Sequence, residues 1–256
     1  MEIFVVDAFT GTAFGGNPAG VVLLTQPRPA EWMQSVAAEM KHAETAFVDP
    51  AAEGAKPLRW FTPAAEVDLC GHATLATAHV LGGEQRFSTR SGELVCVPAG
   101  DGSITMDFPA DPPVRVEPAP DLLAGLPGVT VKATAQAVSD LLVEVATAAE
   151  VRALVPDLAA IGRLPVRGVI VTAPGDRPGL DVVSRCFYPA FGVPEDPVTG
   201  SAHCTLASWW APRLGEGPLT AEQASPRGGT VRMTLRDNRV QLSGRAVTVL
   251  KGQLLV

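Results

Sequence analysis

The sequence predicts a mixed α/β fold built from two similar halves, each with strands wrapped around one buried helix. The main observation is a repeated motif: Arg59–Ala73 reads RWFTPAAEVDLCGHA, and Arg185–Ala202 reads RCFYPAFGVPEDPVTGSA. Both copies begin R-x-F-x-P-A, continue through acidic residues and close on G-x-A. Their spacing of about half the chain is typical of a duplicated domain rather than of a solenoid. Each copy then runs into small apolar residues, which predict a helix that is apolar on all sides and therefore buried.

The composition fits two compact domains and excludes several kinds of partner. The chain has 256 residues, of which 46% are hydrophobic and 18% are charged, enough apolar surface for two cores. The net charge of −7 makes nucleic acids and acidic membranes unsuitable partners. Four cysteines without a CxxC motif indicate reduced, buried thiols, so we expect a cytoplasmic protein. No signal peptide and no apolar run of about 20 residues is expected.

The first half is expected to alternate short strands with two helices. A glycine-rich loop, TGTAFGGNP, ends at Asn17 and Pro18 and can bring backbone amides close to a ligand, although a plain hairpin connection is equally consistent with it. Pro29 opens an amphipathic helix that reaches residue 40. The predicted strands are 3–9, 19–24, 44–48, 58–62, 85–89, 93–98 and 103–108, with 63–68 as a turn, and the buried helix is 71–81.

The second half is expected to repeat this plan after a proline-rich linker, 109–121. Thr147 and Glu150 form a capping box for a short helix that ends near residue 158. We therefore expect domains at 1–112 and 118–256, with the last strand free to return to the first domain. The predicted strands are 131–138, 141–146, 168–172, 181–187, 230–235, 239–243 and 247–255, with a loop at 188–200 and a buried helix at 201–210.

The two buried helices indicate where a ligand would bind. The N-terminus of a helix carries unpaired N–H groups and a partial positive charge, so it attracts anions. If both ends face a cleft between the halves, a small carboxylate is the expected ligand. His72 and Ser201 occupy equivalent places at these ends, and Asp196 precedes the second. Each has a structural alternative: Ser201 as a helix cap, His72 as a core histidine, and Asp196 as a turn residue.

Motifs for other chemistries are missing from the sequence. There is no HExxH, Walker loop, GxSxG or strand-linked GxGxxG. His42 and Glu44 match the H-x-E half of a zinc-deaminase signature, but no P-C-x-x-C follows. We therefore expect no metal and no cofactor, and instead acid–base chemistry by carboxylate and imidazole groups on a small molecule. The pattern alone favours a simpler interpretation of Glu44, as a solvated residue between a helix and a strand.

Four segments in order, VDAFT…FGGNPAGVV, KHAETAFV, RWFTPAAEVDLCGHATLATAHVL and YPAFGVPEDPVTGSAH, resemble the phenazine-biosynthesis PhzF-like family. The resemblance implies the diaminopimelate epimerase-like fold, with two pseudo-symmetric domains, a site between them, and a homodimer. It also implies that Glu44 is the catalytic acid–base group, while His72, Asp196 and Ser201 match the other polar residues of the family's site. We expect the substrate to be bound by Asn17, Gly71, Ala73, Thr199 and Gly200.

The resemblance implies a cofactor-independent isomerase. The best-known reaction of the family moves a proton between ring carbons of trans-2,3-dihydro-3-hydroxyanthranilate. Two alternatives stay open. Related epimerases and racemases use two facing cysteines; Cys70 occupies the first of these positions, but Thr199 occupies the second, and Cys204 lies a helical turn away. The other alternative is a non-catalytic small-molecule binder with the same fold.

Overall fold

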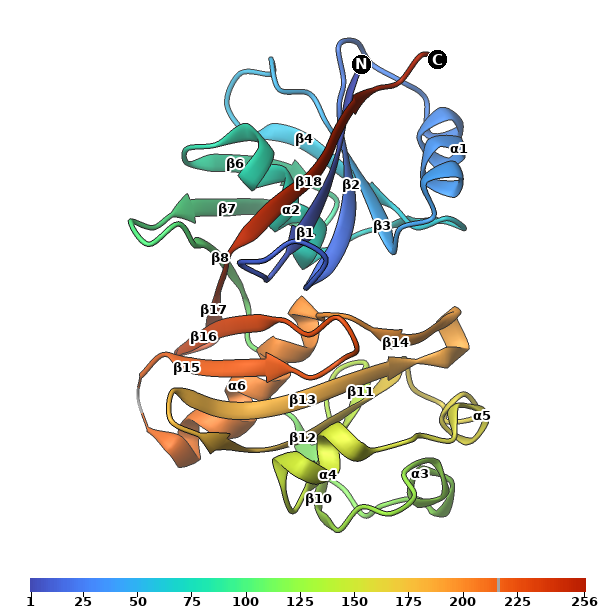
Figure 1. Ribbon diagram of the computed structural model, residues 1–256, viewed down its shortest axis with the longest axis vertical. Coiled ribbons are helices and arrows are strands. Elements are labelled where there is room, and N and C mark those ends of the chain that lie inside the picture. The colour runs from blue at the N-terminus through green and yellow to red at the C-terminus, as the bar shows by residue number, and fades with distance from the viewer. Residues whose placement is uncertain (216) are drawn as a thin grey trace. The chain divides into compact units, whose positions relative to one another are not determined.

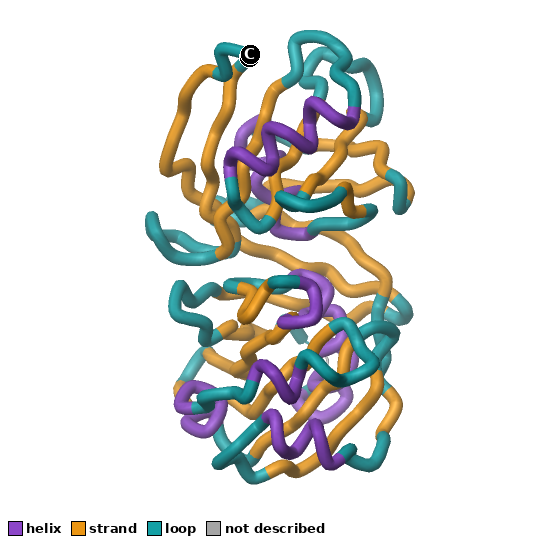
Figure 2. Tube along the Cα trace, turned by 90° about the vertical axis from the view of Figure 1, so that its right-hand side faces the viewer, coloured by secondary structure: helices purple, strands orange, loops and turns teal. Residues whose placement is uncertain are grey.

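The computed structural model describes residues 1–215 and 217–256 and divides them into two units. The first unit comprises Met1–Asp107 and Ser243–Val256, and the second comprises Phe108–Leu242. In each unit more residues lie in strands than in helices, and the helices pack against the strands, so the mixed α/β prediction is confirmed (Figures 1 and 2). Among the described residues, no helix is long and apolar enough to span a membrane.

In the first unit, a mixed sheet surrounds the buried helix α2. Hydrogen-bonded strands follow the order β18-β1-β2-β3-β4-β6-β7-β8, in which β2/β3 and β4/β6 are parallel and the other pairs are antiparallel. Helix α2 packs against β1, β2, β3 and β18 (Figure 1). The elements are β1 (Glu2–Ala8), β2 (Asn17–Leu23), α1 (Ala30–Met40), β3 (Glu44–Val48), β4 (Lys56–Phe61), β5 (Glu66–Val67), α2 (Gly71–Leu81), β6 (Gln85–Thr89), β7 (Gly92–Pro98), β8 (Ile104–Pro109) and β18 (Ala246–Gln253).

The second unit repeats this topology. Its strands follow the order β9-β10-β11-β12-β13-β15-β16, with β11/β12 and β13/β15 parallel and the others antiparallel. Helix α6 packs against β13 and β16. The elements are β9 (Val114–Arg115), α3 (Pro120–Gly125), β10 (Val131–Gln136), β11 (Asp140–Val145), α4 (Ala148–Ala153), α5 (Leu158–Ile161), β12 (Gly168–Arg177), β13 (Leu180–Tyr188), η1 (Pro189–Phe191), β14 (Val193–Asp196), α6 (Gly200–Leu214), β15 (Leu219–Gln223), β16 (Thr230–Arg236) and β17 (Arg239–Gly244).

The repeated motif forms the same ion pair in both units. Arg59 donates two hydrogen bonds to Glu66, at 2.6 and 2.8 Å, and its guanidinium lies over Phe61. Arg185 makes the equivalent pair with Glu195, at 2.7 and 2.8 Å, over Phe187. In each unit the pair links a strand to the short strand that leads into the buried helix, so the duplication in the sequence is also present in the structure.

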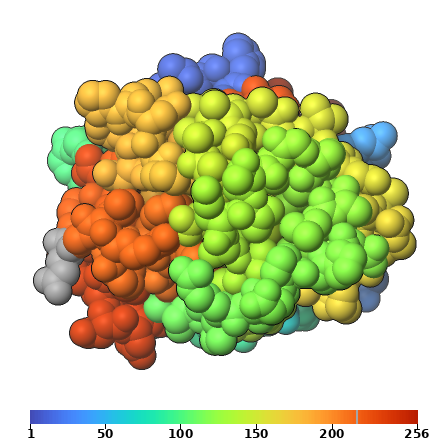
Figure 3. Space-filling model, turned by 90° about the horizontal axis from the view of Figure 1, so that it is seen from below, coloured from blue at the N-terminus to red at the C-terminus, as the bar shows by residue number. Residues whose placement is uncertain are grey.

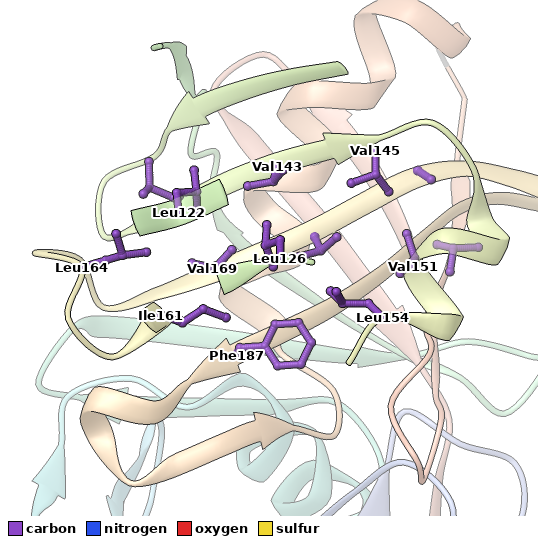
Figure 4. Packing of buried hydrophobic residues seen from close by; sticks show 14 of the residues in the cluster. Leu122, Leu126, Val143, Val145, Val151, Leu154, Ile161, Leu164, Val169 and Phe187 are labelled. Carbon is purple, nitrogen blue, oxygen red and sulfur yellow. The ribbon is translucent and has the colours of Figure 1, made fainter. Parts of the chain in front are cut away.

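In the second unit, an apolar core lies between the sheet and the helices α3, α4 and α5, which cover one of its faces. Buried residues of all three helices pack there against Val143, Val169 and Phe187 (Figure 4). The segment from α3 to α5, green to yellow-green in the space-filling view, covers a broad face of this unit (Figure 3). These helices replace the single helix α1, which covers the corresponding face of the first sheet with Met33, Val36 and Ala37.

Several element predictions need correction. The helix expected from Thr147 to about residue 158 is two helices, α4 and α5, because Pro156 interrupts it. Its capping box forms in part: Thr147 Oγ1 accepts from the N–H of Glu150, whose carboxylate accepts from Ala146 rather than from the cap. Short strands were missed because they carry little pattern: β5 lies in the predicted turn, β9 in the predicted linker, β14 in the predicted loop, and β15 after α6.

Candidate active site

Four side chains of the first unit meet at one end of its sheet. Nε2 of His72 lies 3.2 Å from Oε2 of Glu44, while Nδ1 of the same ring lies 3.3 Å from Nδ2 of Asn17 and 3.5 Å from Sγ of Cys70. The topology of the sheet explains why these four side chains lie close together. Asn17 begins β2 and Glu44 begins the parallel strand β3, so both lie at the same end of the sheet. His72 is the second residue of α2, and Cys70 is its N-cap.

The hydrogen-bond pattern fixes the protonation of His72. Burial, with a smaller contribution from the charge of His42, lowers the pKa of His72 to about 3, so the ring is neutral at neutral pH. The amide nitrogen of Asn17 is a donor, which makes Nδ1 the acceptor and leaves the ring proton on Nε2. That N–H faces the carboxylate of Glu44, whose side chain keeps 20% of its exposure. Glu44 is therefore an accessible carboxylate that lies beside the protonated Nε2 of a neutral imidazole.

Glu44, Cys70 and His72 also carry the ligand types of a transition-metal site. One ligand atom from each lies within 4.8 Å of the others. However, the imidazole turns Nε2 toward Glu44 and Nδ1 toward Cys70, so the two partners lie on different ring nitrogens. One ion binds one nitrogen of a ring, and this arrangement fits an acid–base network better than a preformed metal site. The expectation that no metal or cofactor is needed stays a prediction.

In the second unit, Asp196 is held by its neighbours before α6. Thr199 donates from Oγ1 to Oδ2 of Asp196 at 2.5 Å. Gln223, which is fully buried on β15, accepts from the Thr199 N–H at 2.8 Å and donates to the backbone carbonyl of Asp196 at 2.7 Å. Thr199 is the N-cap residue of α6. Thr199 occupies the position expected for the second cysteine of a two-cysteine epimerase or racemase. Its hydroxyl binds the carboxylate of Asp196.

Ser201 is exposed in the first turn of α6 and accepts a hydrogen bond from Nη2 of Arg167 at 2.9 Å. Arg167 also forms a two-point ion pair with Asp140, at 2.9 and 2.5 Å, and its guanidinium lies over the ring of Tyr188. Asp140 is only 2% exposed. The sequence patterns did not predict Arg167, Asp140 and Gln223 as residues of the site. No motif marks them, although aligning the two halves strand by strand would have placed Arg167 beside the position of Glu44.

The predicted residues thus form one group in each unit. Asn17, Glu44 and His72 are together in the first, and Asp196, Thr199 and Ser201 lie within six residues of one another in the second. Gly71 and Gly200 are the first residues of α2 and α6, while Ala73 is fully buried. The sequence-based roles of these nine residues stay predictions.

Comparison with known proteins identifies the family. The model of the phenazine biosynthesis-like protein family (PhzC-PhzF) matches residues 6–252. The chain belongs to this family. The resemblance noted from the four motifs is thereby confirmed. An uncharacterized isomerase of Halalkalibacterium halodurans is 45% identical to this PhzF-like chain over 99% of it and 98% of the relative. One of Pseudomonas aeruginosa is 47% identical with the same coverage.

Solved structures of PhzF-like proteins share the fold over the full length. A PhzF-family protein of Enterococcus faecalis superimposes with a TM-score of 0.94 at 38% identity, covering 100% of this chain and 99% of the other. A probable proline racemase of Agrobacterium radiobacter shares the fold at 12% identity, with a TM-score of 0.63 over 100% of this chain and 93% of the other. The PhzF-like chain therefore has the fold that is also found in this racemase.

Proposed function

We propose that this PhzF-like protein is a cofactor-independent isomerase, which moves a proton on a small, cyclic, unsaturated carboxylic or amino acid with Glu44 as the acid–base group. The observation that carries the proposal is the pairing of Glu44 with a neutral, buried His72 at 3.2 Å. Full-length relatives named as isomerases support the reaction class.

The proposed step needs only the side chains of the protein. Glu44 removes a proton from one carbon of the substrate, and the electrons of that C–H bond move the adjacent double bond. The carboxylic acid formed on Glu44 then returns the proton to the carbon at the far end of the shifted electrons. No redox change occurs and no group leaves, so atoms and electrons balance. Proton return by the same group is general acid–base catalysis of the kind carboxylates perform.

His72 is assigned the role of a donor rather than that of the base. An imidazole with a pKa of about 3 is a weak base at neutral pH, whereas its protonated Nε2 lies 3.2 Å from the carboxylate of Glu44. We assign to this contact the orientation of the carboxylate before proton transfer. We assign substrate orientation to Asp196 and Ser201, as the family resemblance implies. That they act on the same substrate as Glu44 stays a prediction.

Cys70 keeps a second candidate function open, a two-base epimerase or racemase. Its thiol lies 3.5 Å from Nδ1 of His72, next to the proposed base. The second thiol is replaced by Thr199, whose hydroxyl already donates to Asp196. A threonine hydroxyl engaged in this way is a poor proton carrier, so the one-carboxylate isomerase is the better-supported function. The third alternative is a binder without catalysis.

Deuterium exchange from solvent tests the proposal. The protein is incubated in D2O with trans-2,3-dihydro-3-hydroxyanthranilate and with a panel of cyclic unsaturated carboxylic and amino acids, and the products are followed by NMR. An isomerase gives a shifted double bond, with deuterium at the carbon that receives the proton to the extent that Glu44 exchanges with solvent. An epimerase exchanges deuterium at one stereocentre only. If no compound of the panel is converted or exchanged, the proposal is overturned.

A further inference from the structure

The internal duplication places Arg167 beside the position that Glu44 occupies in the first unit. In the parallel pair β2/β3, Ala19 is opposite Glu44, and in the corresponding pair β11/β12, Asp140 is opposite Gly168. Each of these is the first pair of opposite residues in its two strands. Gly168 therefore corresponds to Glu44, and Arg167 is the residue just before it.

The partner of each residue also corresponds. Glu44 lies against His72, the second residue of α2, and Arg167 donates to Ser201, the second residue of α6. The same junction of strand and helix thus carries a carboxylate with an imidazole in one unit and a guanidinium with a hydroxyl in the other. The first pair suits proton transfer. The second cannot supply a base, because a guanidinium does not give up its proton in proteins.

We propose that Arg167 is a positioning residue, which fixes the Ser201 hydroxyl as a hydrogen-bond donor toward the substrate. The proposal rests on the proposed function, because it takes Ser201 as a substrate-orienting residue. Arg167 donates from Nη2 to Oγ of Ser201 at 2.9 Å, so a lone pair of that oxygen is occupied. The hydroxyl proton of Ser201 is then directed away from the guanidinium, and the adjacent positive charge strengthens it as a donor.

The surroundings of Arg167 hold it in this geometry. Asp140, almost fully buried, binds Nε and Nη2 with its two carboxylate oxygens. The ring of Tyr188 lies under the guanidinium, at 5.1 Å from its centre, and the Tyr188 hydroxyl reaches Asp140 at 3.5 Å. Gly168 leaves the space for that ring, because a Cβ there would lie 2.1 Å from Cδ1 of Tyr188. The arginine is thus held by an ion pair and by a stacked ring while its Nη2, which also binds Asp140, donates to Ser201.

Arg185 offers a matched control for a purely structural ion pair. It has the same two-point pair, with Glu195, and the same stacking on an aromatic ring, that of Phe187. Its remaining donor binds the backbone carbonyls of Val151 and Leu154 rather than Ser201. A loss of function through weakened folding alone would appear in both arginine variants.

The test is a double-mutant cycle on ligand binding, with anthranilate, a fluorescent planar amino carboxylate, as the probe. The dissociation constant is measured by fluorescence for the wild type, R167M, S201A, R167M/S201A and R185M, each checked for folding by circular dichroism. We expect R167M and S201A each to weaken binding by about tenfold, the size of one charge-assisted hydrogen bond. The double variant should bind no more weakly than S201A alone, and R185M should bind as the wild type does.

Several results overturn the proposal. One is a double variant whose dissociation constant rises by the product of the two single effects of R167M and S201A. The others are normal binding of anthranilate by R167M, equally weakened binding by R185M, and a wild type that does not bind anthranilate. If R167M does not fold, R167K replaces it, because lysine can keep the charge near Asp140 but cannot also reach Ser201 in the same way. Failure of the proposed function is distinguishable, since it appears as missing deuterium exchange while the pattern of dissociation constants is retained.

Discussion

The imidazole of His72 joins two segments that are far apart in the sequence, with Nε2 lying 3.2 Å from Oε2 of Glu44 and Nδ1 lying 3.3 Å from Nδ2 of Asn17. The direction of these contacts separates the roles of the two titratable groups. Burial keeps the ring neutral, with its protonated Nε2 beside the carboxylate of Glu44, and that carboxylate retains access to solvent. This arrangement supports the proposed role of Glu44 in proton transfer, which replacement of its carboxylate tests.

Replacement of Glu44 by glutamine is expected to leave the fold intact and to lower kcat by about a hundredfold to ten-thousandfold, the usual contribution of a general base. Glutamine fits the space and can accept from His72, but it cannot take a proton. Turnover is measured on any compound that the deuterium screen identifies. E31Q, at an exposed carboxylate of α1, is the matched control. Wild-type turnover by E44Q would remove Glu44 from the mechanism.

Replacement of Cys70 by serine is expected to change kcat by less than about fivefold, since general acid–base contributions are much larger than this when the group carries the proton. Serine can still hydrogen bond to Nδ1 of His72, which the thiol approaches at 3.5 Å. Deuterium incorporation is the second readout. A loss as large as that of E44Q, together with exchange at a single stereocentre, would instead favour a thiol-dependent epimerase.

Thr199 is expected to contribute to activity by supporting Asp196, although we assign it no role in carrying a proton. Its hydroxyl donates to Asp196 at 2.5 Å and accepts from Gln223 at 3.2 Å. T199V keeps the shape but removes both bonds, so we expect about a tenfold loss in kcat/KM, the value of one hydrogen bond to a charged group. T199S keeps the hydroxyl and should retain most activity. Equal activities of the two variants would show that Asp196 needs no such support.

The main topology and most elements could be predicted from the sequence, because each has a local cause. The ranges of β3, α2 and β6 agree with the predicted 44–48, 71–81 and 85–89, since apolar runs and glycine ends define them. The short strands β14 and β15 escaped prediction because pairing with β13 forms them, and pairing is not a local property.

The candidate site was predictable only in part, for the same reason. The repeat and the family motifs pointed to Glu44, His72 and Ser201, which stand in or beside marked segments. Arg167 and Asp140 carry no such mark. Their importance arises from the register of β11 against β12, which brings Asp140 opposite Gly168. A partner that depends on strand register has no signal in the composition of its own segment.

Acid should destabilise the protein through its buried histidines. Burial lowers the pKa of His72 to about 3, and it lowers the pKa of His203 to about 4 against a weaker opposing hydrogen bond to Thr199. An unfolded histidine titrates near about 6.5. Below that pH the unfolded chain binds protons that the folded chain does not, so the free energy of unfolding falls by up to about 1.4 kcal/mol per pH unit for each histidine.

Urea unfolding at pH 5, 6, 7 and 8 checks this expectation. Stability should be nearly constant from pH 7 to 8 and should fall as the pH drops toward the folded-state pKa values. H203Q can keep a donor toward the carbonyl of Thr199, which Nδ1 approaches at 2.7 Å, and should show a smaller slope between pH 5 and 7. An unchanged slope in H203Q would mean that other groups cause the acid dependence.

Gly168 is expected to be the most sensitive glycine of the second unit's site. An alanine Cβ would lie 2.1 Å from Cδ1 of Tyr188 and 2.6 Å from the carbonyl oxygen of Phe187, so the ring cannot stay where it is. Overpacking of a buried site costs about 1–3 kcal/mol, and here the ring that moves is the one stacked under Arg167. G168A should therefore lower the thermal midpoint and also weaken anthranilate binding. The double variant G168A/Y188A removes the clash with the ring but not that with the carbonyl oxygen of Phe187, so it should regain only part of the stability. It should not regain binding, because the guanidinium of Arg167 then lacks its aromatic support. Full recovery of binding in that variant would show that the stacked ring contributes nothing to holding Arg167 against Ser201.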